Sequence, residues 1–313
     1  MFLDGRDHLG GGLTERLESV GAEHVDEELA DAGGIGGSTR LDRIPAGRRQ
    51  DDIRVASAGL LQGAYGAYVV TNYWVKRTPE EEAAQTRAEM ELQQAEIAAW
   101  AAKAGGLEHV VWSTLEDTRE HFGDDDRVTN IHGAYKVPRF DAKGEADELF
   151  AKNGLPTTFL RTTFYFEAFK TGLGPERDSS GELILTLPMA DQPLSGIAAE
   201  DIGKTALGIF ERGRQFIGKT VSIAGDHLTG DEYAAAMTDV LGEKVVYRPY
   251  NWDEYRELGF PRAVEMANMF QYYAEDSARF TKARDLALVR QLNPELQSFR
   301  DWLAVHKGEI TPG

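Results

Sequence analysis

The chain has 313 residues, which suffices for one large or two small domains with a buried core. It contains no cysteine, so disulfides, a thiol nucleophile and cysteine-ligated zinc or iron–sulfur sites are excluded. Its formal net charge of −18 argues against direct nucleic-acid binding, because the phosphates repel an acidic surface. The seven histidines lack the spacing of a zinc motif, so no metal site is expected.

No targeting or membrane segment is apparent in the sequence. No apolar run reaches the roughly 18 residues of a membrane-spanning helix. The first ten residues, MFLDGRDHLG, lack the basic flank and apolar stretch of a signal peptide. We therefore expect a cytoplasmic protein without membrane contact.

Residues 63–165 alternate short apolar runs with long amphipathic segments. The apolar runs at 66–71, 109–114 and 157–162 predict strands that are buried on both faces. The segments between them predict helices at 78–104 and 141–152. Strands separated by helices indicate an α/β fold with a doubly wound parallel sheet that helices cover on both faces.

The first of these helices has a strong start signal. In Thr78-Pro79-Glu80-Glu81, Thr78 can cap the helix, Pro79 suits the first helical position, and Glu81 completes a capping box. Thr229 and Glu232 form a second capping box further along the chain.

The chain beyond residue 165 predicts a smaller α+β lobe over the carboxyl edge of the sheet. Its expected strands lie at 183–187, 220–224 and 245–250, and its expected helices at 199–212, 229–241, 252–258, 262–275 and 296–306.

Residues 1–60 do not follow this plan. A doubly wound domain normally opens with an apolar strand, and Met1-Phe2-Leu3 is too short to supply one. Glycine-rich tracts at 10–12 and 33–37 instead indicate loop or disorder.

Short motifs that follow one another along the chain point to a family. They are Val70-Thr71-Asn72-Tyr73-Trp74, then residues 110–116, 140–145, 160–167, 225–230, 258–261, 267–270 and 292–294. In this order they resemble the NmrA-like family, atypical members of the short-chain dehydrogenase/reductase superfamily, over about residues 60–306. The resemblance implies a Rossmann fold that binds NADP, with NAD as a possible substitute.

The resemblance also implies a division of the chain. Residues 1–60 are a degenerate start of the Rossmann domain, with its first strand and phosphate loop incomplete, and 61–165 form the cofactor-binding core. Residues 166–313 are mainly a substrate or partner lobe, from which 197–226 returns to the core.

Part of the phosphate-binding machinery is recognisable in the first 60 residues. By resemblance, Gly10, Gly11 and Gly12 match the end of the glycine loop that lets the backbone approach a pyrophosphate. Arg40, after Thr39, matches a residue pair that contacts the ribose 2′-phosphate. The strand and glycines that should precede them are missing. Either the chain starts late or in a shifted reading frame, or a genuine member has lost cofactor binding.

The carboxyl edge of the sheet supplies further candidates. Thr71, Asn72 and Tyr73 end a strand there, where ligands bind in open α/β sheets. By resemblance they line the cofactor, and Lys143 reaches the nicotinamide ribose. The simpler alternatives are a strand end, with Asn72 serving the following turn, and a solvated lysine.

The turn after residue 162 holds the remaining candidates. By resemblance, Tyr165, Phe166 and Glu167 pack against the nicotinamide end of the cofactor, although aromatic core is an equally simple role for the two rings. Ala168 stands where the family has an asparagine, and Gln93 lies near the position of an expected lysine.

The residues for ordinary alcohol dehydrogenation are incomplete. Ser113 ends a strand where such enzymes keep a serine, but the chain contains no Tyr-x-x-x-Lys pair, in which lysine lowers the tyrosine pKa. Tyr135 has Arg139 at that spacing, but Pro138 interrupts any helix between them. No GxSxG nucleophile elbow is present. We therefore expect no catalytic residue.

Three functions remain open from the sequence. The favoured one is a non-catalytic NADP-binding redox sensor that regulates a protein partner, such as a transcription regulator. The alternative is an NAD(P)H-dependent reductase of quinones or other small electrophiles, since hydride transfer to a quinone depends more on orientation than on a strong acid. The third is a cofactor-deficient copy with a disrupted N-terminus.

Overall fold

The computed structural model describes residues 2–3, 57, 59 and 61–310. The predicted cofactor residues Gly10, Gly11, Gly12 and Arg40 lie outside the described residues.

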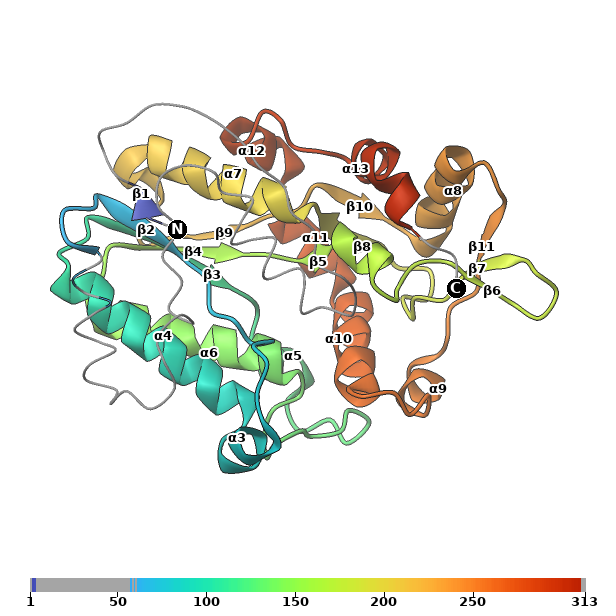
Figure 1. The fold of residues 1–313 in the computed structure, drawn as a ribbon, viewed down its shortest axis with the longest axis horizontal. Coiled ribbons are helices and arrows are strands. Elements are labelled where there is room, and N and C mark those ends of the chain that lie inside the picture. The colour runs from blue at the N-terminus through green and yellow to red at the C-terminus, as the bar shows by residue number, and fades with distance from the viewer. Residues whose placement is uncertain (1, 4–56, 58, 60, 311–313) are drawn as a thin grey trace.

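The main sheet has five strands in the order β1-β2-β3-β4-β9 (Figure 1). They are β1 (Phe2–Leu3), β2 (Gly66–Val69), β3 (His109–Thr114), β4 (Thr157–Arg161) and β9 (Thr220–Ser222). The strands β2, β3, β4 and β9 run parallel, which confirms the predicted doubly wound α/β fold. All six residues of β3 are buried, as expected for a strand that is covered on both faces.

The edge of this sheet differs from a standard doubly wound domain. The strand β1 has two residues and pairs antiparallel with β2, with Phe2 opposite Ala67.

Helices cover both faces of the sheet (Figure 1). One face carries α4 (Arg87–Ala104) and α6 (Pro138–Lys152), and the other carries α7 (Ala199–Glu211) with α12 (Leu286–Leu292) beside it. Successive residues of β3 serve opposite faces, because side chains alternate along a strand: Val110 packs on the α4/α6 side and Val111 on the α7 side.

The prediction of one helix over 78–104 is wrong. The segment forms α3 (Pro79–Ala84) and α4, separated by Gln85 in an extended conformation. Thr86 starts α4 with its own capping box to Glu89, so two start signals lie within nine residues of each other. The capping boxes at Thr78 and Thr229 are confirmed.

The rest of the chain contains two small sheets, ordered β10-β8-β5 and β11-β7-β6. Their strands are β5 (Phe164–Tyr165), β6 (Glu176–Arg177), β7 (Leu183–Leu185), β8 (Leu194–Ile197), β10 (Asp226–Leu228) and β11 (Val245–Tyr247). Of these, β5, β6, β8 and β10 were not predicted, because two to four residues are too few to show a periodic pattern.

The described residues form further helices. They are α5 (Arg119–Phe122), α8 (Gly230–Leu241), α9 (Trp252–Arg256), α10 (Ala263–Glu275), α11 (Ser277–Ala283) and α13 (Phe299–His306), with 3₁₀ turns η2 (Phe166–Lys170), η3 (Gly213–Phe216) and η4 (Lys307–Glu309). Within the described part of the chain, no helix is both long and apolar enough to cross a membrane.

Candidate functional site

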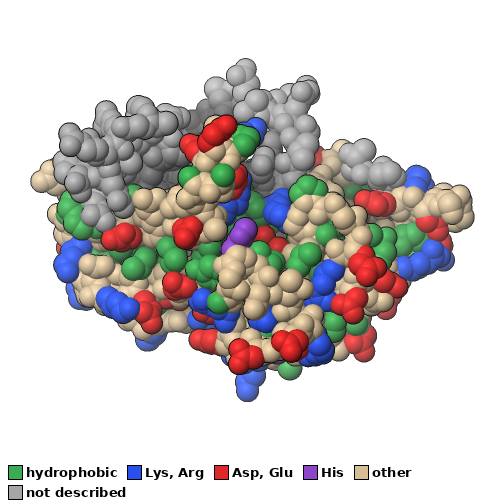
Figure 2. Space-filling model, turned by 90° about the horizontal axis from the view of Figure 1, so that it is seen from below, with side chains coloured by type: hydrophobic (Ala, Val, Ile, Leu, Met, Phe, Trp, Pro, Cys, Tyr) green, Lys and Arg blue, Asp and Glu red, His purple; other side chains and the backbone are tan. Residues whose placement is uncertain are grey.

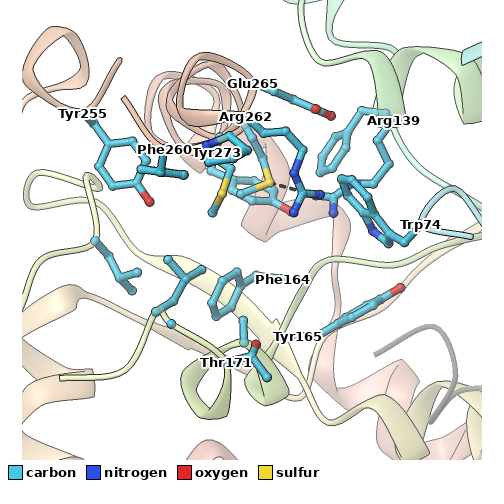
Figure 3. A pocket seen from close by; sticks show the side chains of 18 of the residues that line it. Trp74, Arg139, Phe164, Tyr165, Thr171, Tyr255, Phe260, Arg262, Glu265 and Tyr273 are labelled. Carbon is cyan, nitrogen blue, oxygen red and sulfur yellow. Dashed lines mark hydrogen bonds between the residues drawn. The ribbon is translucent and has the colours of Figure 1, made fainter. Parts of the chain in front are cut away.

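A cavity of about 570 Å³ lies between the carboxyl edge of the main sheet and the helices that follow it in the chain (Figure 3). The sheet side contributes Tyr73, Trp74, Leu115, Arg139, Phe140, Lys143 and residues 162–165. The opposite side contributes Ala168, Leu187, Tyr250, Tyr255, Leu258, Phe260, Arg262, Glu265, Met266, Met269 and Tyr273, among others. Cavities of this size, with apolar walls and few polar groups, are typical of small-molecule sites.

Lys143 lies at the sheet edge in a buried polar cluster. Its ammonium donates to Thr71 Oγ1 at 2.8 Å and pairs with Glu91 Oε1 at 2.8 Å, and the Thr71 hydroxyl also donates to that carboxylate. Its third contact, to the Ser113 carbonyl at 3.5 Å, is at the long limit of a hydrogen bond. The solvated-lysine alternative is thereby wrong, because Lys143 and Glu91 are both buried.

Glu91 is a residue that the sequence reasoning missed. It is fully buried on α4, on the same helix face as Ala95, Ala98 and Ala102. An acidic residue within such an apolar stripe is a signal, since a buried carboxylate needs a partner. Gln93, which was considered instead, has an exposed side chain that accepts from Gln85.

Asn72 and Tyr73 have different surroundings. The Asn72 side chain accepts from the Trp74 amide at 3.0 Å, which is the turn role considered as its alternative. Tyr73 lines the cavity and is 2% exposed. Burial raises the pKa of Tyr73 far above its usual range, so its hydroxyl stays protonated.

The side chains of the three residues 165–167 also have different surroundings. Tyr165 lines the cavity, whereas Phe166 packs in the core against Phe299. Glu167 accepts from the Ala199 amide and from Trp302 Nε1, and so joins η2 to α7 and α13. The structure describes seven of the predicted site residues. Three of them line the cavity: Tyr73, Lys143 and Tyr165.

The sequence reasoning also missed a cationic part of the wall. The Arg139 and Arg262 guanidinium carbons lie 5.3 and 3.9 Å from the centre of the Trp74 ring. Glu265 lies beside them, and burial raises the pKa of its carboxyl group. Figure 3 shows Trp74, Arg139, Arg262 and Glu265 on one side of the cavity, with Tyr165 and Thr171 on the other. Trp74 is the last residue of the family motif at 70–74, but nothing in the sequence indicates that Arg262 lies against it.

Two further tyrosines of the cavity stay protonated near neutral pH. Burial raises the pKa of Tyr255 to about 12, and it also raises the pKa of Tyr273. Ser113 is buried. Among the described residues, no group of three or more histidines and carboxylates could hold a metal ion.

One face of the molecule carries side chains of both charges. On the face seen in Figure 2, Lys and Arg side chains are interspersed with Asp and Glu.

The sheet topology and the site at its carboxyl edge define a Rossmann-type α/β protein. The model of the NmrA-like family matches residues 6–302. The chain therefore belongs to the NmrA-like family.

Solved structures share this fold. The crystal structure of NmrA, a negative transcriptional regulator, has a TM-score of 0.63 at 19% identity and covers 90% of each chain. NmrA in complex with NAD gives 0.62 at 20% identity, over 82% of this chain and 78% of that one. An NADPH-dependent quinone oxidoreductase from Escherichia coli gives 0.57 at 17% identity, over 82% and 81%. Identities this low show the fold alone.

Proposed function

We propose that this protein binds NAD(P)H along the carboxyl edge of β2, β3 and β4 and reduces a planar aromatic electrophile, such as a quinone, in the adjoining cavity. The carrying observation is the cavity itself, about 570 Å³ in volume with mainly apolar and aromatic walls that begin at Tyr73, Lys143 and Tyr165. Two structural relatives support it: an NmrA structure that holds NADP and the quinone oxidoreductase.

The described residues fit such a cofactor. The ammonium group of Lys143 has three donors, and only two of them make short contacts with Thr71 and Glu91. The long contact to the Ser113 carbonyl leaves one donor that can turn to a ribose hydroxyl. When bound, NADPH supplies the hydride.

The chain's own residues orient the electrophile and exclude water. Ala168 lines the cavity where the family has an asparagine, so the wall is apolar and roomier at this point. Raised pKa values keep Tyr73 and Tyr255 protonated and make them weak acids. Reduction of a quinone can proceed without a stronger acid, because it depends mainly on a fixed geometry between the hydride donor and the quinone.

A specific observation also favours a second candidate, the redox-sensing regulator. The three tyrosines Tyr73, Tyr255 and Tyr273 all have pKa values shifted away from neutrality, and Lys143 is held in an ion pair. A site without a proton donor tuned to neutral pH suits binding without turnover. In that case the cavity ligand and NAD(P)H bind, but no NADPH is consumed.

The test is quinone-dependent oxidation of NADPH, followed at 340 nm with 1,4-naphthoquinone. We expect turnover by the unmodified protein and a loss of roughly tenfold or more in Ala168→Phe, because the added ring occupies the cavity. The matched control is Ala278→Phe, which adds the same ring at an exposed position on α11.

Two results would decide against the reductase. A rate equal to the protein-free blank, with both ligands bound, leaves the regulator. Full activity in Ala168→Phe shows that the reaction does not use this cavity.

A further inference from the structure

Three exposed apolar side chains lie together at the cavity. Among the described residues, five large hydrophobic side chains are exposed, and three of these, Tyr250, Leu258 and Phe260, also line the cavity. Single apolar side chains on a surface are ordinary, whereas a group at one place calls for an explanation. We call these three residues the rim. The rim includes part of the family motif at 258–261, to which the proposed function assigns no role.

The local structure holds the rim in place. Gly259 has a φ of +72°, a left-handed conformation that favours glycine, and the ring of Pro261 fixes its own φ. The Phe260 ring meets the buried Tyr255 ring edge-on with the centroids 5.6 Å apart, and the Tyr250 ring lies 6.0 Å from Tyr255 on the same terms. The rim is therefore an ordered apolar surface that continues the cavity wall towards solvent.

The cavity reaches from the sheet edge to the rim. Figure 3 shows Trp74 and Tyr165 at one end of the cavity and Tyr255 and Phe260 at the other, with Phe164 between them. Its volume of about 570 Å³ lies in the range of sites for drug-sized ligands. A two-ring quinone that binds at the sheet edge, next to the nicotinamide, therefore leaves the end near the rim open.

The surroundings of the rim favour a ligand of the cavity over a broad partner surface. The other two exposed hydrophobic side chains, Trp100 on α4 and Val305 on α13, are on distant elements and do not extend the rim (Figure 1). Asp253, Glu254 and Glu257 are exposed on the same segment as the rim, and their charge opposes contact with an anionic membrane. An apolar chain on a ligand in the cavity covers the rim without a larger apolar surface around it.

We propose that the cavity takes a planar aromatic ring that carries an aliphatic chain, with the ring at the sheet edge and the chain along the cavity to the rim. Covering the rim and the chain removes apolar surface from water on both sides, which favours binding. The inference rests on the proposed function and names its substrate class. It applies equally if the ligand binds without being reduced.

The test compares 1,4-naphthoquinone with 2-hexyl-1,4-naphthoquinone by calorimetric titration in excess NADP⁺, which has no hydride to transfer. The chain has no cysteine that could form a thiol adduct with either probe. We expect the hexyl probe to bind roughly fiftyfold more tightly, as burial of about half of its six-carbon chain provides.

Substitutions at the rim show where the hexyl chain lies. Leu258→Ser and Phe260→Ser should each reduce the ratio of the two affinities about fivefold, because the hexyl chain loses an apolar neighbour. The matched control is Val305→Ser, which makes a similar change at a position that is 72% exposed on α13 and should leave the ratio intact.

Each other outcome overturns the inference in a recognisable way. Equal affinity of the unmodified protein for both probes removes the substrate class but not the proposed function. Failure to bind either probe removes both. A ratio that stays the same in Leu258→Ser and in Phe260→Ser, or that falls equally in Val305→Ser, removes the role of the rim. The two rim variants are independent, so the one that folds decides if the other does not.

Discussion

The two halves of the molecule build their cores from different side chains. Between the main sheet and helices α4 and α6, small residues predominate, among them Ala67, Ala95, Ala99, Ala102 and Ala146. In the lobe, rings contact rings: Phe166, Phe169, Tyr233, Phe299 and Trp302 form one continuous cluster. Small side chains let helices lie close to a sheet, whereas large rigid rings leave gaps where they do not interlock.

The cavity lies where these two kinds of packing meet. One of its polar groups, Lys143, is held by Thr71 and Glu91 in the close-packed half, and most of its apolar wall comes from the aromatic half. The main sheet with α4 and α6 thus forms a platform that holds the polar side of the site in place.

The largest expected effect on stability comes from breaking the buried ion pair between Glu91 and Lys143 in the platform. Glu91→Ala leaves the Lys143 ammonium buried without its counter-charge and should lower the free energy of unfolding by about 3–5 kcal/mol. The double variant Glu91→Leu with Lys143→Met should recover most of this loss, because it removes both charges. Urea unfolding of the three proteins measures both values. Equal stability of Glu91→Ala and the unmodified protein would contradict the platform role.

The stability of the platform should also depend on pH, because it contains a buried histidine. His109 is fully buried in β3, its Nε2 lies 2.8 Å from Thr158 Oγ1, and burial lowers its pKa to about 4. The unfolded chain, with a histidine pKa near 6.5, binds the proton first, so stability falls as the pH drops from about 6.5 to 4. The full loss is on the order of 3 kcal/mol.

The measurement is urea unfolding of the unmodified protein and of His109→Gln at several pH values in that window. The variant should lose less stability in acid. Asp147, whose pKa burial raises to about 6, acts in the opposite direction but is present in both proteins, so the difference between them isolates His109. Parallel pH profiles would show that His109 does not resist protonation.

The smallest expected effect compares one helix start in each half. Thr86 caps α4 in the platform and Thr229 caps α8 in the lobe, each within a capping box. Each substitution by alanine should cost about 1 kcal/mol, because one backbone amide loses its acceptor. Thermal unfolding should give similar shifts for both if the halves unfold as one unit. A shift in one variant alone would show that they unfold separately.

Much of the fold was predictable, for physical reasons that the strands make clear. The segments 109–114 and 157–162 have apolar central residues because helices cover both faces of the sheet, so each strand is recognisable from its own sequence. The break at Gln85 was missed, although Thr86 and Glu89 repeat the start signal of Thr78 and Glu81. Strands such as β5 exist through pairing with a distant partner, β8, and have no local pattern.

The site was predictable only where the family motifs run through it. Tyr73, Lys143 and Tyr165 line the cavity, and each lies within one of the motifs that carry the family resemblance. Arg262 could not be found in this way, since it reaches Trp74 from a loop almost two hundred residues further along the chain. The assignment of residues to the cofactor, and the division of the chain near residue 165, stay predictions.

We propose that one cavity serves both the cofactor at the sheet edge and an aromatic ligand. A crystal structure of the protein grown with NADPH and 1,4-naphthoquinone would show whether it does. We expect the quinone inside the cavity, between Tyr165 and Trp74, with the nicotinamide next to it at the sheet edge. A bound cofactor with the quinone elsewhere on the protein, or a nicotinamide that lies away from Lys143, would contradict it.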